Sequence, residues 1–194
     1  KFYKFFRENE LPIPDTTFVE NEESLKESII QFGINKKYYL KSDYSKNPNY
    51  VYNFNGFDQE SIDIFWGRDR FLRNHYILQQ EFMGEHIRIN LVGREFIIFP
   101  MNYGDKLIMS KKKIEKMGII DKLKKIIKKL KIDNWIVKFD IVVNESDFVA
   151  LDIGLDPPYR LNLLYNKLKL DMSKFYIEQY LNNQINYPVL NYDN

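Results

Sequence analysis

The sequence contains no cysteine and only two histidines among its 194 residues. The lack of cysteine excludes disulfide bonds, thiolate zinc sites and a cysteine nucleophile within this sequence. With only His75 and His86 present, neither a Ser-His-Asp triad nor a histidine-rich metal site is expected. The chemistry of the chain must therefore depend on carboxylates, lysines, arginines and backbone groups.

Sequence signals of several other functional classes are also missing. No apolar run approaches the roughly 20 residues that span a bilayer, and no signal peptide is visible. The patterns Gly-x-x-x-x-Gly-Lys, Gly-x-Gly-x-x-Gly, Gly-x-Ser-x-Gly and His-Glu-x-x-His do not occur. The net charge of +2 is too small to indicate nucleic-acid binding. The cytoplasm is therefore the expected compartment, and neither membrane nor nucleic acid is an expected partner.

Hydrophobic periodicity and turn residues predict an α+β fold. A lobe boundary near Asn74 would divide the chain into residues 1–75 and 76–194. The second part is expected to open with an antiparallel meander of three strands, residues 76–82, 86–92 and 95–103. The remaining expected strands are 15–19, 37–41, 50–54, 136–143 and one beginning at Phe148; the expected helices are 1–8, 22–32, 59–71, 119–130, 161–168 and 172–183.

The expected hairpin near the end carries two carboxylates in corresponding places. Its strands, residues 136–143 and the segment from Phe148, are joined by an expected turn at residues 144–147. A register that pairs Val143 with Val149 matches the apolar residues of both strands.

In that register Ile141 lies opposite Leu151, and Asp140 lies directly opposite Asp152. Like charges in such positions destabilise a sheet, so a cation is expected between the two carboxylates. Paired oxygen ligands suit Mg²⁺, which water and substrate phosphates usually complete.

Three basic or polar segments allow both a functional and an ordinary interpretation. Lys41 ends a strand and can reach a phosphate as a point charge, or it is one surface lysine among many. Residues 79–88 can present backbone to an adenine edge and a carboxylate to ribose, or they form a polar strand end. The lysines crowded into residues 106–131 fit a solvated helix face better than an electrostatic funnel for an anionic substrate or phosphate-rich partner.

The order of these segments resembles the ATP-grasp family of ATP-dependent ligases, particularly its ribosomal-protein glutamate ligase and peptide-maturase branches. The resemblance covers residues 5–160 and lies in the order and spacing of loose motifs. They are Leu11-x-Ile-Pro, a strand ending in Lys41, Gln80-Glu-Phe-Met-Gly-Glu, Ile87-Arg, Lys138-Phe-Asp and Leu151-Asp-Ile. It implies the ATP-grasp fold, with ATP between two α+β lobes, and a preceding substrate-binding domain that is expected to be absent from this chain.

The resemblance also implies roles for individual residues. Lys41 would contact the α- and β-phosphates of ATP, and Arg88 would hold phosphate or an acyl-phosphate intermediate. Asp140 and Asp152 would be the acidic Mg²⁺ ligands. The adenine hinge would comprise Gln80, Glu81, Phe82 and Met83, and Glu85 or His86 would bind ribose.

Two departures from the family pattern bear on catalysis. The second acidic strand usually reads Glu-x-Asn, with the asparagine helping to bind metal, whereas this chain has Gly154 two residues after Asp152. Asp156 could supply the third ligand, or it could be a turn former before a proline. The loop at residues 42–49 has no glycine, although Ser45 and Lys46 could reach phosphate.

The resemblance thus implies a Mg-ATP-dependent ligase that joins a carboxylate to an amine through an acyl phosphate. The substrates would be a small molecule or a peptide. A degenerate ATP-grasp module that binds nucleotide or a partner protein without ligation is the main alternative. Phosphoryl transfer without amide formation is a third.

Overall fold

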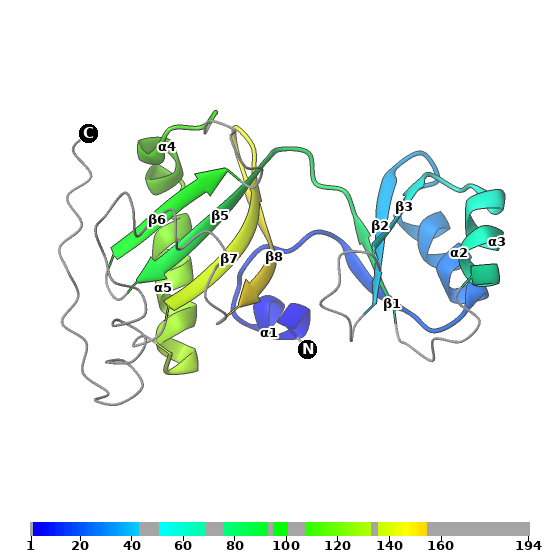
Figure 1. Cartoon of the computed structure of the whole chain (residues 1–194), viewed down its shortest axis with the longest axis horizontal. Helices are drawn as coiled ribbons and strands as arrows, with labels where there is room; N and C mark the ends of the chain where they lie inside the picture. The colour runs from blue at the N-terminus through cyan, green and yellow to red at the C-terminus, as the bar shows by residue number, and fades with distance from the viewer. Residues whose placement is uncertain are drawn as a thin grey trace. The chain divides into compact units, whose positions relative to one another are not determined.

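The structure is a computed structural model of the chain and describes residues 2–42, 51–68, 76–92, 95–100, 108–132 and 136–154. It has an α+β fold, as predicted, with two antiparallel sheets (Figure 1). The chain divides into two compact units, Ile13–Phe82 and Lys1–Pro12 with Met83–Asn194. No helix among the described residues is long and apolar enough to cross a membrane.

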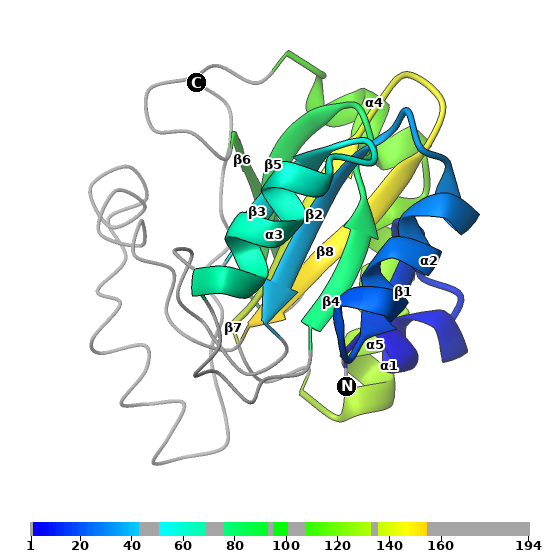
Figure 2. The same cartoon turned by 90° about the vertical axis from the view of Figure 1, so that its right-hand side faces the viewer.

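The unit Ile13–Phe82 is built on a four-stranded sheet with the order β1-β4-β2-β3. Its two helices lie over one face of that sheet (Figure 2). Large apolar side chains of the sheet and the helices form one buried cluster between them, which includes Leu25, Tyr38, Leu40, Phe65 and Leu78. The elements are β1 (Thr16–Val19), α2 (Glu22–Phe32), β2 (Lys37–Ser42), β3 (Val51–Asn55), α3 (Gln59–Arg68) and β4 (Tyr76–Gln80).

Helix α2 has the predicted bounds because both of its ends carry local signals. The Asn21 side chain accepts a hydrogen bond from the backbone N–H of Ser24 at 2.8 Å, and the Ser24 hydroxyl accepts one from the Asn21 backbone at 3.1 Å. This reciprocal pair satisfies N–H groups that a helix start leaves without partners. Gly33 follows the last turn with a φ of 120°, a backbone conformation that favours glycine.

The second unit has the strand order β6-β5-β7-β8, and α5 lies along one face of its sheet (Figure 1). Helix α5 has the predicted bounds. It turns Leu123 and Ile126 inward and its lysines outward. Short helix α4 lies in a segment where no helix was predicted. The elements are α1 (Phe2–Glu8), β5 (Glu85–Val92), β6 (Glu95–Pro100), α4 (Lys111–Lys116), α5 (Ile119–Leu130), β7 (Ile136–Val143) and β8 (Phe148–Gly154).

The predicted meander is wrong in its first strand. Strand β4 does not pair with β5 but lies between β1 and β2, with Gln79 opposite both Thr16 and Tyr39. Its alternate residues Tyr76 and Leu78 fill the core of the first unit, and this burial fixes its partner strands. The unit boundary consequently falls after Phe82 rather than after residue 75.

The β7–β8 hairpin reaches the predicted pair of carboxylates through a different register. Residues 144–147 form the expected turn, but Val143 pairs with Phe148 and not with Val149. A register shift beside Asp140 then leaves Leu151 as an extra residue in β8. Beyond this β-bulge Asp140 does lie opposite Asp152, as predicted.

Helix α3 is described from Gln59 to Arg68, and residues 69–71 of its predicted range lie outside the described residues. The predicted helices at residues 161–168 and 172–183 lie outside the described residues.

Candidate functional site

Three ionisable side chains form one row across the second sheet. Arg88 of β5 pairs with Asp140 of β7, which pairs in turn with Asp152 of β8. The neighbours of Arg88 in β5, Ile87 and Ile89, are fully buried. Since side chains alternate along a strand, the row lies on the face opposite that core. We call Arg88, Asp140 and Asp152 the ionic row.

Arg88 and Asp140 form a bidentate ion pair. The Arg88 Nε and Nη2 donate to the two carboxylate oxygens of Asp140 at 2.6 and 2.9 Å. The two side chains are only 17% and 12% exposed, so water screens the pair weakly. Hydrogen bonding to Asp140 is the main cause that raises the pKa of Arg88, with smaller contributions from the charges of Asp140 and Asp152. The predicted phosphate-binding arginine therefore has an anionic partner of its own.

A second row beside the ionic row contains residues that the resemblance did not assign. Asn90 pairs with Lys138, and Lys138 pairs with Gly154. The Lys138 stem crosses Gly154 so closely that a Cβ there would lie 2.2 Å from Lys138 Cε. Asn90 is 1% exposed, and its Oδ1 has no hydrogen-bond partner in the described part of the chain. Side chains two residues apart on a strand share a face. The sequence alone could therefore have placed Asn90 beside Arg88 and Lys138 beside Asp140.

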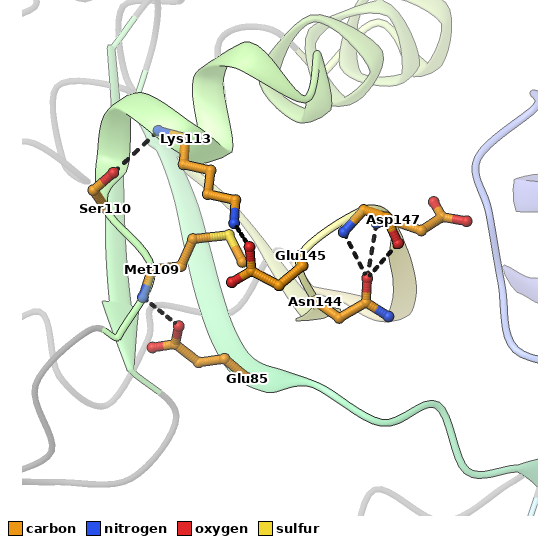
Figure 3. Close-up of polar contacts among 8 residues, drawn as sticks. Glu85, Met109, Ser110, Lys113, Asn144, Glu145 and Asp147 are labelled. Atoms are coloured by element: carbon orange, nitrogen blue, oxygen red, sulfur yellow. Dashed lines mark hydrogen bonds and ion pairs between the residues drawn. The ribbon is translucent and has the colours of Figure 1, made fainter.

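The predicted ribose ligand Glu85 makes contacts within its own unit (Figure 3). Its two carboxylate oxygens accept hydrogen bonds from the backbone N–H groups of Ile108 and Met109 at 2.8 and 2.7 Å. Ser110, the next residue, caps α4 through the backbone of Lys113. Glu85 thus fixes the entry to α4, a role that no sequence pattern indicated. The alternative ribose ligand His86 is exposed.

The turn of the β7–β8 hairpin has its own polar contacts (Figure 3). The Asn144 side chain accepts hydrogen bonds from the backbone N–H groups of Ser146 and Asp147 at 3.0 and 2.8 Å. Glu145 in this turn forms an ion pair with Lys113 of α4. The short polar side chain explains why a tight turn forms here.

Lys41 lies in the first unit, on the sheet face opposite the helices. Its Nζ donates to Gln79 Oε1 at 2.7 Å. Gln79 is 1% exposed, and its Nε2 donates to Thr16 Oγ1 at 3.2 Å. Gln79 was not among the predicted site residues, although its place on the same sheet face follows once β4 is paired with β2.

Glu81 of the predicted hinge belongs to a second polar group on this face. Its Oε1 accepts hydrogen bonds from Lys37 Nζ at 2.8 Å and from the Tyr39 hydroxyl at 2.7 Å. Hydrogen bonding to Lys37 lowers the pKa of Glu81, and the same bond raises the pKa of Lys37. Gln80, the residue before Glu81, accepts a hydrogen bond at its Oε1 from Lys36 Nζ at 2.9 Å. The Met83 side chain of the predicted hinge is 73% exposed.

The donor set of the ionic row fits Mg²⁺. Asp140 and Asp152 supply hard carboxylate oxygens on adjacent strands, and Mg²⁺ is commonly held by one or two carboxylates together with water and phosphates. Each Asp140 oxygen can still accept beyond its bond to Arg88, because a carboxylate oxygen has two lone pairs. Within the described ranges no group of three or more His, Asp or Glu side chains is placed to hold a metal. The predicted ligands Ser45, Lys46 and Asp156 lie outside those ranges.

No family model matches the sequence, and no curated protein does. Solved structures match the fold over most of this chain.

A RimK domain ATP-grasp protein from Sphaerobacter thermophilus has a TM-score of 0.65 and 16% identity, with 85% of this chain and 60% of that chain covered. The D-alanine-D-alanine ligase of Helicobacter pylori has a TM-score of 0.68 and 15% identity, covering 95% and 58%. The macrocyclase MdnC from Microcystis aeruginosa, bound with its precursor peptide MdnA, has a TM-score of 0.64 and 18% identity, covering 93% and 57%.

At these identities the likeness concerns the fold. The chain spans 57–60% of the length of these three proteins.

Proposed function

The chain has the ATP-grasp fold in a divergent form, and we propose that it serves a Mg-ATP-dependent ligase that joins a carboxylate to an amine. The ionic row carries this proposal. It joins an arginine to two facing carboxylates on one sheet face, which combines a cation for phosphate with ligands for a divalent metal. An ATP-dependent reaction suits the cytoplasm, which the lack of cysteine in this sequence also favours.

In the proposed reaction the protein binds and orients the substrates instead of attacking them. A carboxylate oxygen of the first substrate attacks the γ-phosphorus, and ADP leaves. The amine nitrogen of the second substrate then attacks the acyl carbon, loses a proton, and phosphate leaves. Such a sequence depends on positioning and on neutralising phosphate charge.

The described residues can divide this work between them. Lys41 offers an ammonium to the α- and β-phosphates, and Arg88 offers two N–H groups to the transferred phosphoryl group when Asp140 releases them. Asp140 and Asp152 would hold Mg²⁺, which when bound neutralises phosphate charge. Residues 80–83 and either Glu85 or His86 remain proposed contacts of adenine and ribose.

The structural neighbours guide the proposal for the substrates. They include a ligase of D-alanine and a macrocyclase bound to a precursor peptide. We therefore propose a small-molecule or peptide carboxylate as the acyl substrate.

Binding of Mg-ATP to the chain tests the proposal most directly. We expect calorimetry to show binding that needs Mg²⁺ and is at least about tenfold weaker in Asp152→Asn, a loss of about 1.4 kcal/mol. Asp152 is exposed, so this variant should fold normally. Asp121→Asn, an equal charge change at an exposed position of α5, is the control. Absence of Mg-ATP binding by the unmodified chain would refute the proposal.

A nucleotide-binding module without ligase activity is the second candidate. It is favoured by Gly154, which offers no side-chain ligand, and by the Lys138 stem that crosses it. This candidate predicts that Mg-ATP binds but that no substrate carboxylate stimulates ADP release by the full-length protein. Substrate-dependent ADP release would exclude it.

A further inference from the structure

Positive charge is concentrated in the segment that holds α4 and α5. Residues 111–131 contain ten lysines against one glutamate and one aspartate, a net charge of +8. The whole chain has a net charge of +2, so the remaining residues together carry −6. A nearly balanced chain therefore contains one strongly basic segment, and this segment belongs to the second unit.

The lysines of α5 lie on the solvent side of the helix. Its apolar residues, such as Leu123 and Ile126, are buried. Residues three or four apart on a helix are neighbours, and like charges at these spacings destabilise it. Only the lysines of the last turn are favoured by the helix dipole. We call the exposed lysines of α5 the lysine face: Lys122, Lys124, Lys125, Lys128 and Lys129.

The lysine face lacks the acids that a merely solvated helix face contains. Such faces usually alternate charges of opposite sign, whereas α5 has Asp121 as its single acid. Lys122 Nζ lies 5.4 Å from the ring centroid of Phe148, and Lys124 Nζ lies near another ring. Among the described residues, no carboxylate forms an ion pair with any lysine of this face. The face therefore presents positive charge to solvent.

The lysine face and the ionic row lie on opposite sides of the second sheet. Lys124 Nζ lies 5.7 Å from the ring centroid of Phe96, which pairs with Leu91. Leu91 shares a sheet face with the buried Ile87 and Ile89. Helix α5 thus covers the apolar face of the sheet (Figure 1), and the ionic row lies on the other. Binding of ATP at the ionic row therefore does not account for the lysine face.

The residue types favour an acidic polypeptide over a nucleic acid as the partner. Proteins that hold single-stranded nucleic acid add aromatic side chains on which bases stack, and base recognition often uses bidentate arginine. Residues 111–131 contain neither arginine nor an aromatic residue. Lysine ammonium groups are point charges on flexible stems, which suit separate carboxylates. The 12 residues of α5 extend over about 18 Å, a length that about six residues of extended peptide cover.

We propose that the lysine face docks an acidic stretch of about six residues in a peptide substrate, at a site separate from the nucleotide. This inference deepens the proposed function, on which the role of the peptide as a substrate rests. Docking at a second site raises the effective concentration of the reacting carboxylate without any new contact to it.

Binding of a probe peptide without nucleotide tests the docking directly. The probe is fluorescein-labelled hexaglutamate, and fluorescence anisotropy measures its affinity for the chain. We expect the triple variant Lys125→Gln/Lys128→Gln/Lys129→Gln, the face variant, to bind hexaglutamate about tenfold more weakly or worse. Lysine and glutamine have similar helix propensities, so α5 should still form. Hexaglutamine, which carries no side-chain charge, should not bind the unmodified chain.

Two control variants separate the lysine face from the net charge of the chain. Lys4→Gln/Lys26→Gln/Lys36→Gln removes the same net charge outside residues 111–131 and should change the affinity for hexaglutamate by less than about twofold. Replacing the three lysines of the face variant with arginine keeps their charge and should preserve binding. Equal losses of affinity in the two glutamine variants would mean general charge attraction and would overturn the docking site.

A hexathymidylate probe distinguishes the two classes of polyanion. We expect it to bind the unmodified chain more weakly than hexaglutamate does. Tighter binding of hexathymidylate, with loss in the face variant, would assign the face to nucleic acid and reject an acidic peptide.

Measurements with Mg-ATP separate this inference from the proposed function. The face variant should bind Mg-ATP as the unmodified chain does, and a matching loss of Mg-ATP affinity would contradict a separate site. If the unmodified chain binds Mg-ATP but not hexaglutamate, the docking inference is wrong and the proposed function stands. If it binds hexaglutamate at the lysine face but not Mg-ATP, the proposed function fails and the docking site stands.

Discussion

The two sheets use the same kinds of side chain in opposite ways. In the Ile13–Phe82 unit the cation Lys41 is bonded to a neutral amide, and that buried amide has partners at both ends. In the other unit the cation Arg88 is bonded to the carboxylate of Asp140. The buried amide there, Asn90, leaves its oxygen without a partner in the described residues.

This difference separates two ways of holding a positive charge for an anion. The described bond of Lys41 goes to the neutral amide of Gln79, whereas an anion that approaches Arg88 must compete with the carboxylate of Asp140. A cation bound to Asp140 would weaken the carboxylate's hold on Arg88, so metal and phosphate binding should favour each other in the second unit.

The largest expected effect comes from breaking the ion pair of the second unit. Asp140→Ala leaves Arg88, which is 17% exposed, without its bidentate partner. Breaking a fully buried pair costs about 3–5 kcal/mol, and partial exposure should reduce this to about 2 kcal/mol. Urea unfolding measures the loss.

Two controls sharpen this prediction. The double variant Arg88→Met/Asp140→Leu should recover most of the stability, because an apolar pair needs no compensating charge. Asp152→Asn, at an exposed position, should change the free energy of unfolding by less than about 0.5 kcal/mol. A loss in Asp152→Asn as large as that in Asp140→Ala would contradict the assignment of stability to the Arg88 pair.

The two buried amides should respond differently to the same substitution. Gln79→Leu removes two hydrogen bonds and should cost about 1–2 kcal/mol. Asn90→Leu removes a buried acceptor without a partner and should be neutral or stabilise by up to about 1 kcal/mol. Urea unfolding of both variants checks the contrast. An equal loss in Asn90→Leu would mean that its Oδ1 is hydrogen-bonded in the folded protein.

The smallest expected effect concerns Glu81 and Lys37, the charged pair of the first unit. The pKa of Glu81 is lowered in the fold from an ordinary value of 4.5, mainly by its hydrogen bond with Lys37. Its contribution to stability is therefore present above pH 4.5 and is lost as the pH falls through the lowered pKa. The pKa of Lys37 is raised from 10.5, so its contribution is present below pH 10.5 and is lost as the pH rises through the raised pKa.

Glu81→Gln tests this window directly. The variant should be less stable than the unmodified chain between pH 4.5 and 10.5, and the difference should shrink towards zero in stronger acid. Thermal unfolding across this range measures it. A difference that stays constant into strong acid would indicate lost packing instead of a lost charge pair. Since the Lys37 side chain is 41% exposed, the effect is expected to be small.

Local sequence signals predicted the parts of the fold that depend on local contacts. Asn21 and Gly33 marked the ends of α2, and the spacing of Leu123 and Ile126 marked the buried side of α5. The turn at residues 144–147 follows from side-chain bonds within four residues. In each case the residues that determine the structure lie within one or two helical turns of it.

Features set by distant contacts could not be predicted in this way. The sequence of β4 is compatible with pairing to β5. Burial of Tyr76 and Leu78 places β4 in the other sheet instead. Several side-chain partners follow only from the three-dimensional arrangement. These include Gln79 for Lys41, the backbone of Met109 for Glu85, and Asp140 for Arg88. The roles of these residues toward nucleotide and metal stay predictions.

The extra residue Leu151 changes the phase of β8 halfway along its length. Counted from the pairing of Phe148 with Val143, strict alternation would turn Asp152 to the side of the apolar core. The single insertion exchanges the two sides of every later residue, so Asp152 comes to lie beside Asp140. Before the bulge the even-numbered residues of β8 share the face of Val143 and Ile141, and after it the odd-numbered residue Ile153 does, opposite Phe139. An uncharged leucine, by its presence alone, determines that the two acids face each other.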